Sequence, residues 1–472
     1  AAAALEPGET FRFGMTHLEI VEGEWRESYS AFRRFMEDQG NRTPKGFNPP
    51  VHWNELYDNQ FFGNIAASVQ DPNVWPAMAR QYYRIEDMRI EAAKAAELGC
   101  ELFYMDPGWD TACCSTVWDT ERLGTVQDFI KMIQTDYGIQ YIGLWTPLAE
   151  GPPSFVEPDK YTKDALRRDE NGKIIDYFYN WGPPEHQKTR PLLCSGSPAY
   201  LDVKVKHFLE LAQNGVKFFL IDGTQFSGPC CDPSHGHRIP YTRHEHVMGY
   251  FKMIQEIKRQ YPDVLIEIHD LMAGPCSFRY VPTYFLYTKP FAHDALWAFE
   301  YMWDPMANLM SGESIALYYL NLAYSVPFYL HINLKTDNAN ALVFWWNAST
   351  IRYLGVGGKH PDENIWQAHK NAMQTYLRLK PFFTRGEFFG LDEMIHVHTL
   401  PKKNAAVINC FNLAENPETK TFTVELSQVG LSPQSQYEIR GAAASRRQGD
   451  TLEISATLEG KDAAVIEVIP VS

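Results

Sequence analysis

The sequence predicts an α/β protein in which a (β/α)8 TIM barrel is followed by a C-terminal antiparallel β-sandwich. The first observation is that amphipathic helical segments alternate with short, continuous apolar runs from residue 48 to about residue 385. Such runs are typical of parallel strands that are buried on both faces. The second observation is a change after residue 388 to short alternating segments separated by Asn, Pro and Gly turns, as in antiparallel sheets.

Four helices are predicted by apolar positions that repeat with the helical period. They span residues 81–98, 125–137, 200–214 and 243–260. A glycine or a proline follows each of them and marks its end: Gly99, Gly138, Gly215 and Pro262.

Each of these helices is followed by an apolar strand that leads to a polar or aromatic residue. In all four units this residue lies seven positions after the residue that ends the helix: Asp106, Trp145, Asp222 and His269. The carboxyl ends of parallel strands meet at one rim of a barrel, and the active sites of (β/α)8 barrels lie there. We therefore expect the four side chains to lie on that rim.

Four further strands complete the predicted barrel, at 50–55, 296–300, 327–332 and 341–345. No glycine-rich phosphate loop follows any predicted strand, which makes a nucleotide-binding sheet the weaker alternative. The predicted domains are a leading segment at 1–47, the barrel at 48–387 and the sandwich at 388–472. Within the leading segment, a strand is predicted at 10–21 and a helix at 28–38.

The charge balance narrows the class of partner. The 472 residues include 58 acidic and 43 basic side chains, which give a formal charge of −15, and there is no basic cluster. Nucleic acid and anionic membranes are therefore not expected as partners. No apolar run approaches about 20 residues, and the first eight residues lack the basic and apolar regions of a signal peptide. The compartment is left open, with a periplasmic or secreted location favoured over the cytoplasm.

Carboxylates and aromatic residues together indicate a sugar site. Aromatic residues make up 14% of the chain, and several stand beside carboxylates, although a large aromatic core would also explain this content. Glycoside hydrolysis needs two carboxylates that flank one anomeric carbon. The carboxylates at or near predicted strand ends are Glu55, Asp106, Asp110, Asp222, Glu267, Asp270, Glu300 and Asp304.

Asp222 is the expected nucleophile because it ends a fully apolar strand and precedes Gly-Thr-Gln, which opens a long loop rather than a helix. The alternative is that it forms a cap or a loop hydrogen bond. Glu300 and Asp304 are the candidates for the acid/base, with Glu300 favoured, and a structural hydrogen bond is the alternative for either. If both roles hold, the reaction retains configuration and the two carboxyl groups lie about 5–5.5 Å apart.

Several segments resemble the family 36 and family 27 glycoside hydrolases, the α-galactosidase group of clan D. Tyr-Met-Asp-Pro-Gly-Trp at 104–109 resembles their Leu-Asp-Asp-Gly-Trp element, and Gly-Leu-Trp at 143–145 resembles the next strand of family 36. The helix and strand at 201–222 resemble the stretch that carries the family nucleophile. Residues 261–268 match the fifth strand, and Asp304-Pro falls in the acid/base loop. Residues 5–11 resemble the last strands of the family's large N-terminal β-sandwich.

The resemblance implies a retaining exo-acting α-glycosidase that removes terminal sugars from oligo- or polysaccharides by double displacement. Asp222 would attack the anomeric carbon, and Glu300 or Asp304 would protonate the leaving oxygen and then activate water. Asp106 would hold sugar hydroxyls. No metal or organic cofactor is implied. The expected substrate-binding residues are Trp53, Glu55, Asp106, Trp109, Trp145, His269 and Asp270.

Two departures from family 36 concern residues that bind sugar hydroxyls. Leu220 stands where the family has Lys, and Pro107 stands where it has the second Asp. The resemblance therefore does not extend to galactose specificity. The bulk of the N-terminal sandwich has no counterpart, which suggests a cleaved chain, a separate subunit or a shortened architecture; a homo-oligomer is a further expectation.

Two other functions compete with the glycosidase. His235, His237, Cys230 and Asp232 lie in one loop, before His244 and His246, and could bind zinc in a metal-dependent hydrolase. Structural or sugar-contacting histidines are favoured, because catalytic zinc sites in barrels usually gather ligands from several strand ends. The second alternative is a non-catalytic carbohydrate-binding subunit.

Eight cysteines include two adjacent pairs, Cys113–Cys114 and Cys230–Cys231, and no Cys-x-x-Cys spacing. They are either inert thiols or partners in a disulfide, and a disulfide would imply an oxidising compartment. Because both pairs follow predicted strands at the same rim, we expect at least one pair to lie within contact distance of the sugar site.

Overall fold

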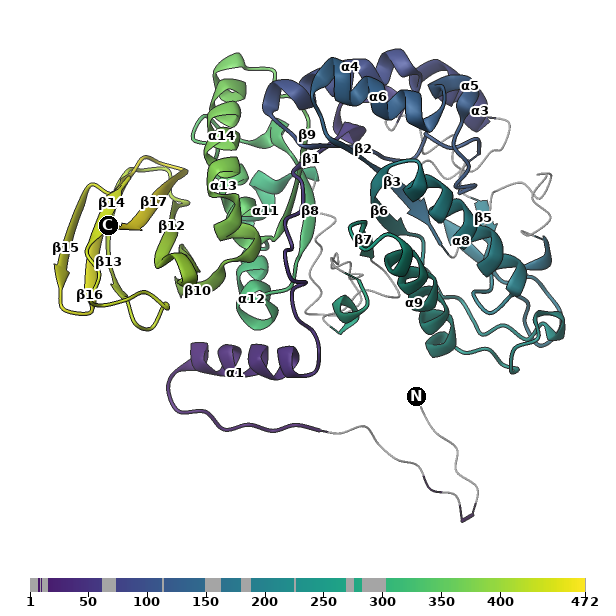
Figure 1. The fold of residues 1–472 in the computed structure, drawn as a ribbon, viewed down its shortest axis with the longest axis horizontal. Coiled ribbons are helices and arrows are strands. Elements are labelled where there is room, and N and C mark those ends of the chain that lie inside the picture. The colour runs from purple at the N-terminus through teal and green to yellow at the C-terminus, as the bar shows by residue number, and fades with distance from the viewer. Residues whose placement is uncertain are drawn as a thin grey trace.

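The computed structural model describes residues 7–8, 10, 16–61, 74–112, 114–148, 163–179, 188–224, 226–268, 276–281 and 303–471. In this part of the chain a curled parallel sheet is surrounded by helices, and antiparallel sheets pack beside it (Figure 1). The predicted fold class, a (β/α)8 barrel followed by an antiparallel β-sandwich, is confirmed. The predicted domain limits remain predictions.

Seven strands form the parallel sheet, in the order β7-β6-β3-β2-β1-β9-β8, and every neighbouring pair is parallel. Their bounds are β1 His52–Asn54, β2 Leu102–Met105, β3 Tyr141–Pro147, β6 Val216–Asp222, β7 Leu265–Ile268, β8 Tyr329–Asn333 and β9 Tyr353–Gly357. The predicted strand at 296–300 lies outside the described residues.

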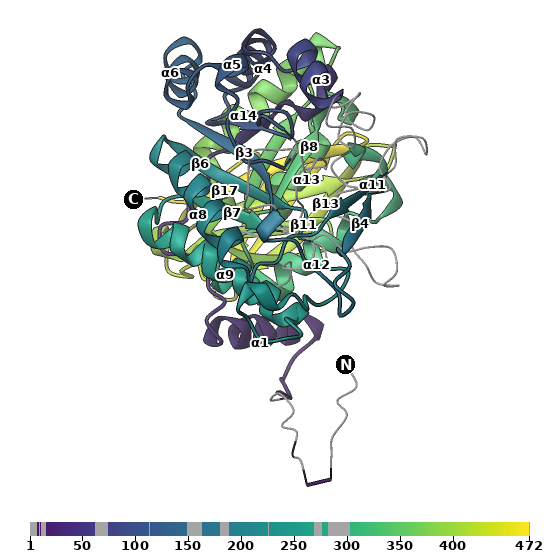
Figure 2. The same ribbon diagram turned by 90° about the vertical axis from the view of Figure 1, so that its right-hand side faces the viewer.

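Helices form the outer layer, and α8 and α9 lie side by side over β6 and β7 (Figures 1 and 2). The four helices predicted from the period correspond to α4, α6, α8 and α9. The glycine after α4 and the glycine after α6 both have a left-handed backbone, which ends each helix. The helices are α1 Trp25–Asp38, α3 Val74–Tyr82, α4 Ile85–Leu98, α5 Thr120–Leu123, α6 Val126–Tyr137, α8 Pro198–Gln213, α9 Arg243–Gln260, α11 Pro305–Ser311, α12 Ile315–Tyr324, α13 Leu342–Thr350 and α14 Glu363–Arg385.

Shorter elements lie in the connections. The hairpin of β4 Asp176–Tyr179 and β5 Lys188–Pro191 belongs to the long segment between β3 and α8. Single 3-10 turns are η1 Glu55–Tyr57, η3 Pro233–His235, η5 Ser277–Arg279, η6 Leu334–Thr336 and η7 Pro401–Lys403.

The strand predicted at 341–345 is wrong, because this run belongs to helix α13. All nine residues of α13 are buried, so no face of the helix is exposed and its sequence shows no helical period. The strand that follows β8 in the sheet is β9 instead. The strand predicted at 10–21 is also absent in its described part, since residues 16–21 form no strand, whereas the predicted helix at 28–38 is present as α1.

Aromatic rings fill the barrel interior. His52 on β1 lies 5.0 Å from the ring of Tyr329 and 5.7 Å from that of Phe218, measured between centroids. The hydroxyl of Tyr329 and Nε2 of His52 are 3.0 Å apart, within hydrogen-bond distance. Burial lowers the pKa of His52 well below its usual range, so the imidazole is neutral in the folded protein. Gly355 makes room for it, because a Cβ there would overlap the His52 ring.

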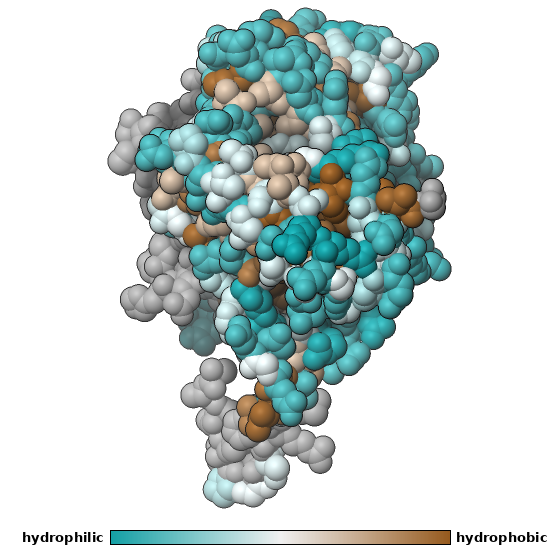
Figure 3. All heavy atoms as spheres, turned by 90° about the vertical axis from the view of Figure 1, so that its left-hand side faces the viewer, coloured by the Kyte–Doolittle hydropathy of each residue, from teal (hydrophilic) through white to brown (hydrophobic). Residues whose placement is uncertain are grey.

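The antiparallel sheets have a core of their own. Five strands pair in the order β10-β11-β12-β17-β14 and three in the order β13-β16-β15. The strands are β10 Glu387–Asp392, β11 Ile395–Leu400, β12 Ala405–Asn412, β13 Glu418–Glu425, β14 Tyr437–Arg440, β15 Ala444–Gln448, β16 Thr451–Leu458 and β17 Asp462–Pro470. The molecular face on this side is mainly hydrophilic with scattered apolar groups (Figure 3).

Helix α13 connects the barrel with these sheets. The rings of Trp346 on α13 and Phe411 on β12 lie 5.0 Å apart, and Ser349 Oγ is 2.8 Å from Nδ1 of His396 on β11. At the other end of the chain, α1 packs on α12 through Phe32 and Tyr324. None of the helices in the described ranges is long and apolar enough to cross a membrane.

We expect Gly355→Ala to lower the free energy of unfolding by at least about 2 kcal/mol, since the added methyl group overlaps His52 and lies 2.8 Å from Cβ of His331. Urea denaturation measures this change. Gly172→Ala is the control: its backbone has φ of +77° and nothing lies near the added group, so only backbone strain of about 1 kcal/mol is expected. Equal losses in the two variants would contradict the crowded interior.

Candidate active site at the carboxyl ends of the strands

Strand pairing brings Trp145 and Asp222 together at one rim. Trp145 pairs with Leu220, and Pro147 pairs with Asp222, in the parallel register of β3 and β6. The Trp145 indole Nε1 donates a hydrogen bond of 3.0 Å to Oδ2 of Asp222. The backbone N–H of Gly223 donates to Oδ1 at 2.5 Å. Both oxygens of the half-buried carboxylate are therefore oriented by N–H donors.

An irregularity in this pairing sets the level of Asp222. Ile142 pairs with Val216, but Gly143 pairs with Phe218, so Lys217 is an extra residue on β6. Phe218 lies so close to β3 that a Cβ on Gly143 would be 2.7 Å from its ring. The extra residue advances β6 by one position against β3 and so places Asp222 beside the end of β3.

Asp106 is close enough to Asp222 for the two charges to interact, and its pKa is unusual. It follows β2, is 8% exposed, and accepts a hydrogen bond of 2.9 Å from Nδ2 of Asn54. Burial raises the pKa of Asp106 to about 7, and the negative charge of Asp222 contributes to the increase. Near neutral pH, Asp106 therefore holds a proton in a substantial fraction of molecules.

Glu55 positions Asp106 rather than reaching the solvent. Its Oε1 accepts hydrogen bonds from the Asp106 backbone N–H at 2.8 Å and from the Tyr83 hydroxyl at 2.7 Å, and the side chain is 1% exposed. Burial and the charge of Asp106 raise the pKa of Glu55 well above its usual range. Gly108 allows Tyr83 to approach, because a Cβ on Gly108 would lie 2.5 Å from the tyrosine ring.

Of the three tryptophans expected in the pocket wall, only Trp145 contacts the candidate nucleophile. Trp109 is fully buried, and its Nε1 donates to the backbone carbonyl of Trp145 at 2.9 Å. Trp53 is also fully buried, and its side chain points from β1 to the helices, where Nε1 donates to Glu91 on α4 at 3.1 Å. Neither side chain has surface for a ligand, so the site we propose keeps Trp145 alone and treats Trp109 as its support.

Of the two acid/base candidates, Asp304 lies in the described part of the chain and Glu300 does not. Asp304 is exposed and caps helix α11, where its Oδ1 accepts from the Ala307 backbone N–H at 3.0 Å. This hydrogen bond is the structural alternative to a catalytic role. Three of the expected site residues lie outside the described residues: Glu300, His269 and Asp270. Directly before Asp304, the ring of Trp303 packs edge-on against Tyr57, at 5.4 Å between centroids.

Two other carboxylates at predicted strand ends are buried inside the protein. Asp110 is buried, and its Oδ2 accepts from the backbone N–H groups of Ser115 and Thr116. Burial raises the pKa of Asp110 to about 7. Glu267 is fully buried on β7. We assign neither of them to the chemistry.

Sequence reasoning missed Asn54 and Tyr83, which hold Asp106 and Glu55. Asn54 had a weak signal, since it is the last residue of β1 and directly precedes Glu55. Tyr83 had none, because it follows α3 and reaches the rim only through the packing of that helix.

No cysteine in the described part of the chain forms a disulfide. Cys114 and Cys230 are buried and Cys231 is half-buried, whereas Cys113 lies outside the described residues. The expected contact between a cysteine pair and the sugar site remains a prediction.

Sequence comparison identifies no relative: no protein-family model and no curated protein matches the chain. The fold, in contrast, is similar to solved structures. The α-galactosidase from Lactobacillus brevis superposes with a TM-score of 0.63 at 14% identity, over 94% of this chain and 58% of that chain. The family 36 α-galactosidase AgaA from Geobacillus stearothermophilus gives 0.64 at 15% identity, over 94% and 59% of the two chains. An α-amylase from Anoxybacillus gives 0.56 at 12% identity, over 90% and 98%.

These comparisons confirm the resemblance to family 36 at the level of the fold. Our chain spans less than two thirds of the length of either α-galactosidase. At such low identity the similarity carries no assignment of substrate.

We expect Asp106→Asn to stabilise the protein at pH 8 by about 4 kcal/mol and at pH 4.5 by only about 1 kcal/mol. Folding raises the pKa of Asp106 from 3.8 to about 7, so its contribution to stability is complete below about pH 4 and is lost as the pH rises through 7. Asparagine has no charge to bury and removes this loss. Urea denaturation at the two pH values measures the difference.

Asp58→Asn is the matched control with the opposite sign. Lys94 and Lys335 hold the pKa of Asp58 below its usual range, and Lys94 Nζ is 2.8 Å from its carboxylate. Its replacement should destabilise the protein at pH 8. An Asp106→Asn effect that is the same at both pH values would contradict the raised pKa.

Proposed function

We propose that the protein is a retaining exo-acting α-glycosidase that hydrolyses terminal sugars from oligo- or polysaccharides. The observation that carries this proposal is the carboxylate pair at the rim: Asp222, oriented by Trp145 and Gly223, beside the more deeply buried Asp106. The family 36 neighbours, which are similar in fold, include an AgaA variant in complex with stachyose and another in complex with raffinose. This supports a glycosidase class, and the carboxylates of the present chain support the mechanism.

Asp222 is the proposed nucleophile. One carboxylate oxygen would attack the anomeric carbon, while the leaving oxygen takes a proton from the acid and the bond to the leaving group breaks. The resulting glycosyl ester of Asp222 is then hydrolysed by water, and the acid, now acting as base, takes the proton from that water. Because each step inverts the anomeric carbon, the product keeps the configuration of the substrate.

Glu300 is the proposed acid/base, with Asp304 as the alternative. The cap on α11 already occupies an oxygen of Asp304 and leaves the residue exposed. A general acid needs a raised pKa, which an apolar environment provides. Tyr301, Met302 and Trp303 follow Glu300 directly in the sequence and are the residues expected to provide it.

Asp106 is proposed to bind sugar hydroxyls. With a pKa of about 7 it exists in both protonation states near neutral pH, so it can donate a hydrogen bond to a hydroxyl or accept one. Its proton also avoids a second full negative charge beside Asp222, since two adjacent carboxylates repel each other. Leu220, two positions before the nucleophile, is apolar and only 6% exposed, so the proposal names the α-glycoside class and not galactose.

The first test is the nucleophile. We expect Asp222→Asn to lower kcat on aryl α-glycosides by at least about 10³-fold, because the covalent step requires a carboxylate oxygen. Asp222→Gly with added azide should recover turnover and yield the β-glycosyl azide, since azide enters where the carboxylate attacked. Asp202→Asn, an exposed position on α8, is the control that keeps activity. Proton NMR of the wild type should show the α-anomer first. A β-anomer formed first would contradict retention.

The second test is the hydrogen bond to the nucleophile. We expect Trp145→Phe to reduce kcat by about 10–100-fold, because it removes the N–H that orients Oδ2 while keeping an aromatic ring in place. KM should change less than kcat if the indole acts on Asp222 and not on the sugar. Steady-state kinetics separate the two parameters. An increase in KM with an unchanged kcat would mean that Trp145 contacts the sugar instead.

A further inference from the structure

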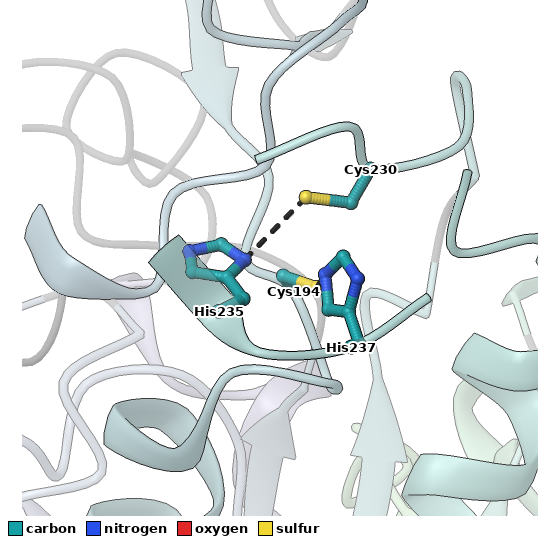
Figure 4. Close-up of side chains that lie close together, drawn as sticks. All are labelled: Cys194, Cys230, His235 and His237. Atoms are coloured by element: carbon teal, nitrogen blue, oxygen red, sulfur yellow. Dashed lines mark hydrogen bonds between the residues drawn. The ribbon is translucent and has the colours of Figure 1, made fainter. Parts of the chain in front are cut away.

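Four potential metal ligands converge outside the proposed active site. Cys194 lies in the segment before α8, whereas Cys230, His235 and His237 lie in the loop between β6 and α9. One ligand atom from each side chain lies within 4.8 Å of every other one. Figure 4 shows the two thiols and the two imidazoles directed toward a common centre. The cysteine from a separate segment completes a set that the loop alone does not provide.

The distances fit a tetrahedral ion. Cys194 Sγ is 3.3 Å from Nε2 of His237, and Cys230 Sγ is 3.5 Å from Nδ1 of His235. Zinc binds sulfur at about 2.3 Å and imidazole nitrogen at about 2.0 Å, so neighbouring S and N ligands on a tetrahedron lie about 3.5 Å apart. Two of the four sulfur–nitrogen edges already have about this length, and every remaining edge between ligand atoms is no longer than 4.8 Å.

The backbone fixes both segments in this arrangement. The Cys194 N–H donates to the carbonyl of Ala165 at 2.7 Å. Cys230 exchanges two backbone hydrogen bonds with Tyr241, at 3.0 and 2.8 Å. Between the two histidines, Gly236 has φ of +71°, which turns the chain so that both rings reach the same side. The site is thus held by the main chain before any ion binds.

His237 also has a hydrogen-bond partner for its second ring nitrogen, as is usual for metal-bound imidazoles, whereas a carboxylate lies farther from the second nitrogen of His235. Nδ1 of His237 is 2.9 Å from the carbonyl oxygen of Arg238, which keeps the proton on Nδ1 and leaves the Nε2 lone pair for a metal. Nε2 of His235 lies 3.9 Å from the carboxylate of Asp232. Arg168, in the segment before β4, forms an ion pair of 3.2 Å with the same carboxylate of Asp232.

We propose that Cys194, Cys230, His235 and His237 bind one zinc ion as a structural site that ties the segment before α8 to the loop after Asp222. Three of the four side chains are buried, and two thiolates balance the charge of the ion. Four protein ligands leave no open position for a water or substrate, unlike a catalytic zinc centre. The metal-dependent hydrolase considered from the sequence is therefore disfavoured, and the zinc proposal does not depend on the glycosidase proposal.

A disulfide between Cys194 and Cys230 is the competing explanation for the two thiols. It would use both sulfurs and leave the two imidazoles without a role at the same centre. Mass spectrometry of the non-reduced protein distinguishes the two, because a disulfide lowers the mass by two hydrogens and joins the two peptides.

The test is the metal content of the full chain, purified without chelators and measured by elemental mass spectrometry. We expect about one zinc per chain in the wild type, and less than about one tenth of that in Cys194→Ser, Cys230→Ser and His237→Gln. The matched controls are Cys231→Ser, beside Cys230, and His244→Gln, an exposed histidine at the start of α9. Both should keep the zinc, and so should Asp222→Asn, which separates this result from the test of the nucleophile.

A second measurement uses only the wild type, so its result does not depend on whether the variants fold. Protein stripped of metal and titrated with Co²⁺ should develop the strong visible absorption of a tetrahedral cobalt–thiolate centre, saturating at one ion per chain. Wild type that contains no zinc and develops no such band overturns the proposal. Zinc that persists in the Cys194→Ser variant, or a Cys194–Cys230 disulfide in the purified protein, also overturns it.

Discussion

The pairing of β3 with β6 is the constraint on which the candidate site depends. Lys217 is an extra residue in β6, and it shifts every later residue of that strand by one position against β3. Without it, Ile221 instead of Asp222 would pair with Pro147, and a one-residue change in pairing reverses which side chains share a face. The close approach of Phe218 to Gly143 accompanies the irregularity. The pairing of β6 with β3 thereby determines whether the carboxylate meets the indole of Trp145.

At the carboxyl ends of the strands, the protein buries two acidic side chains, Glu55 and Asp106. Glu55 and Asp106 are nearly inaccessible, and burial raises the pKa of both. Their oxygens are met by N–H and O–H donors, from Asn54, from Tyr83 and from the main chain. These donors reduce the desolvation penalty without removing it. The rim therefore stores unfavourable electrostatic energy of the kind that active sites use to set protonation states.

The sequence predicted the parts of the fold that have a period or a sharp end. Asp106, Trp145 and Asp222 could be placed at strand ends because apolar runs stop there. The helices could be predicted because apolar residues repeat along one face of each. Helix α13 could not be recognised, since a helix buried on all sides has no polar face to give a period. Trp53 was expected in the pocket because its strand could be predicted. The sequence did not show whether its side chain points into the barrel or toward the surrounding helices. Cys194 and Tyr83 depend on contacts between distant segments, which no local pattern contains.

The position of helix α13 has a consequence for how the molecule comes apart. Its side chains belong to the same continuous hydrophobic core as the barrel strands, and that core extends to Val407 and Phe411 on β12. The C-terminal sheets thus cover a surface that the barrel cannot leave exposed to water. A chain that ended at the last residue of α14 would present Trp346 and its neighbours to solvent and would be prone to aggregate. Barrel and sandwich, although distinct in architecture, therefore share this part of the hydrophobic core.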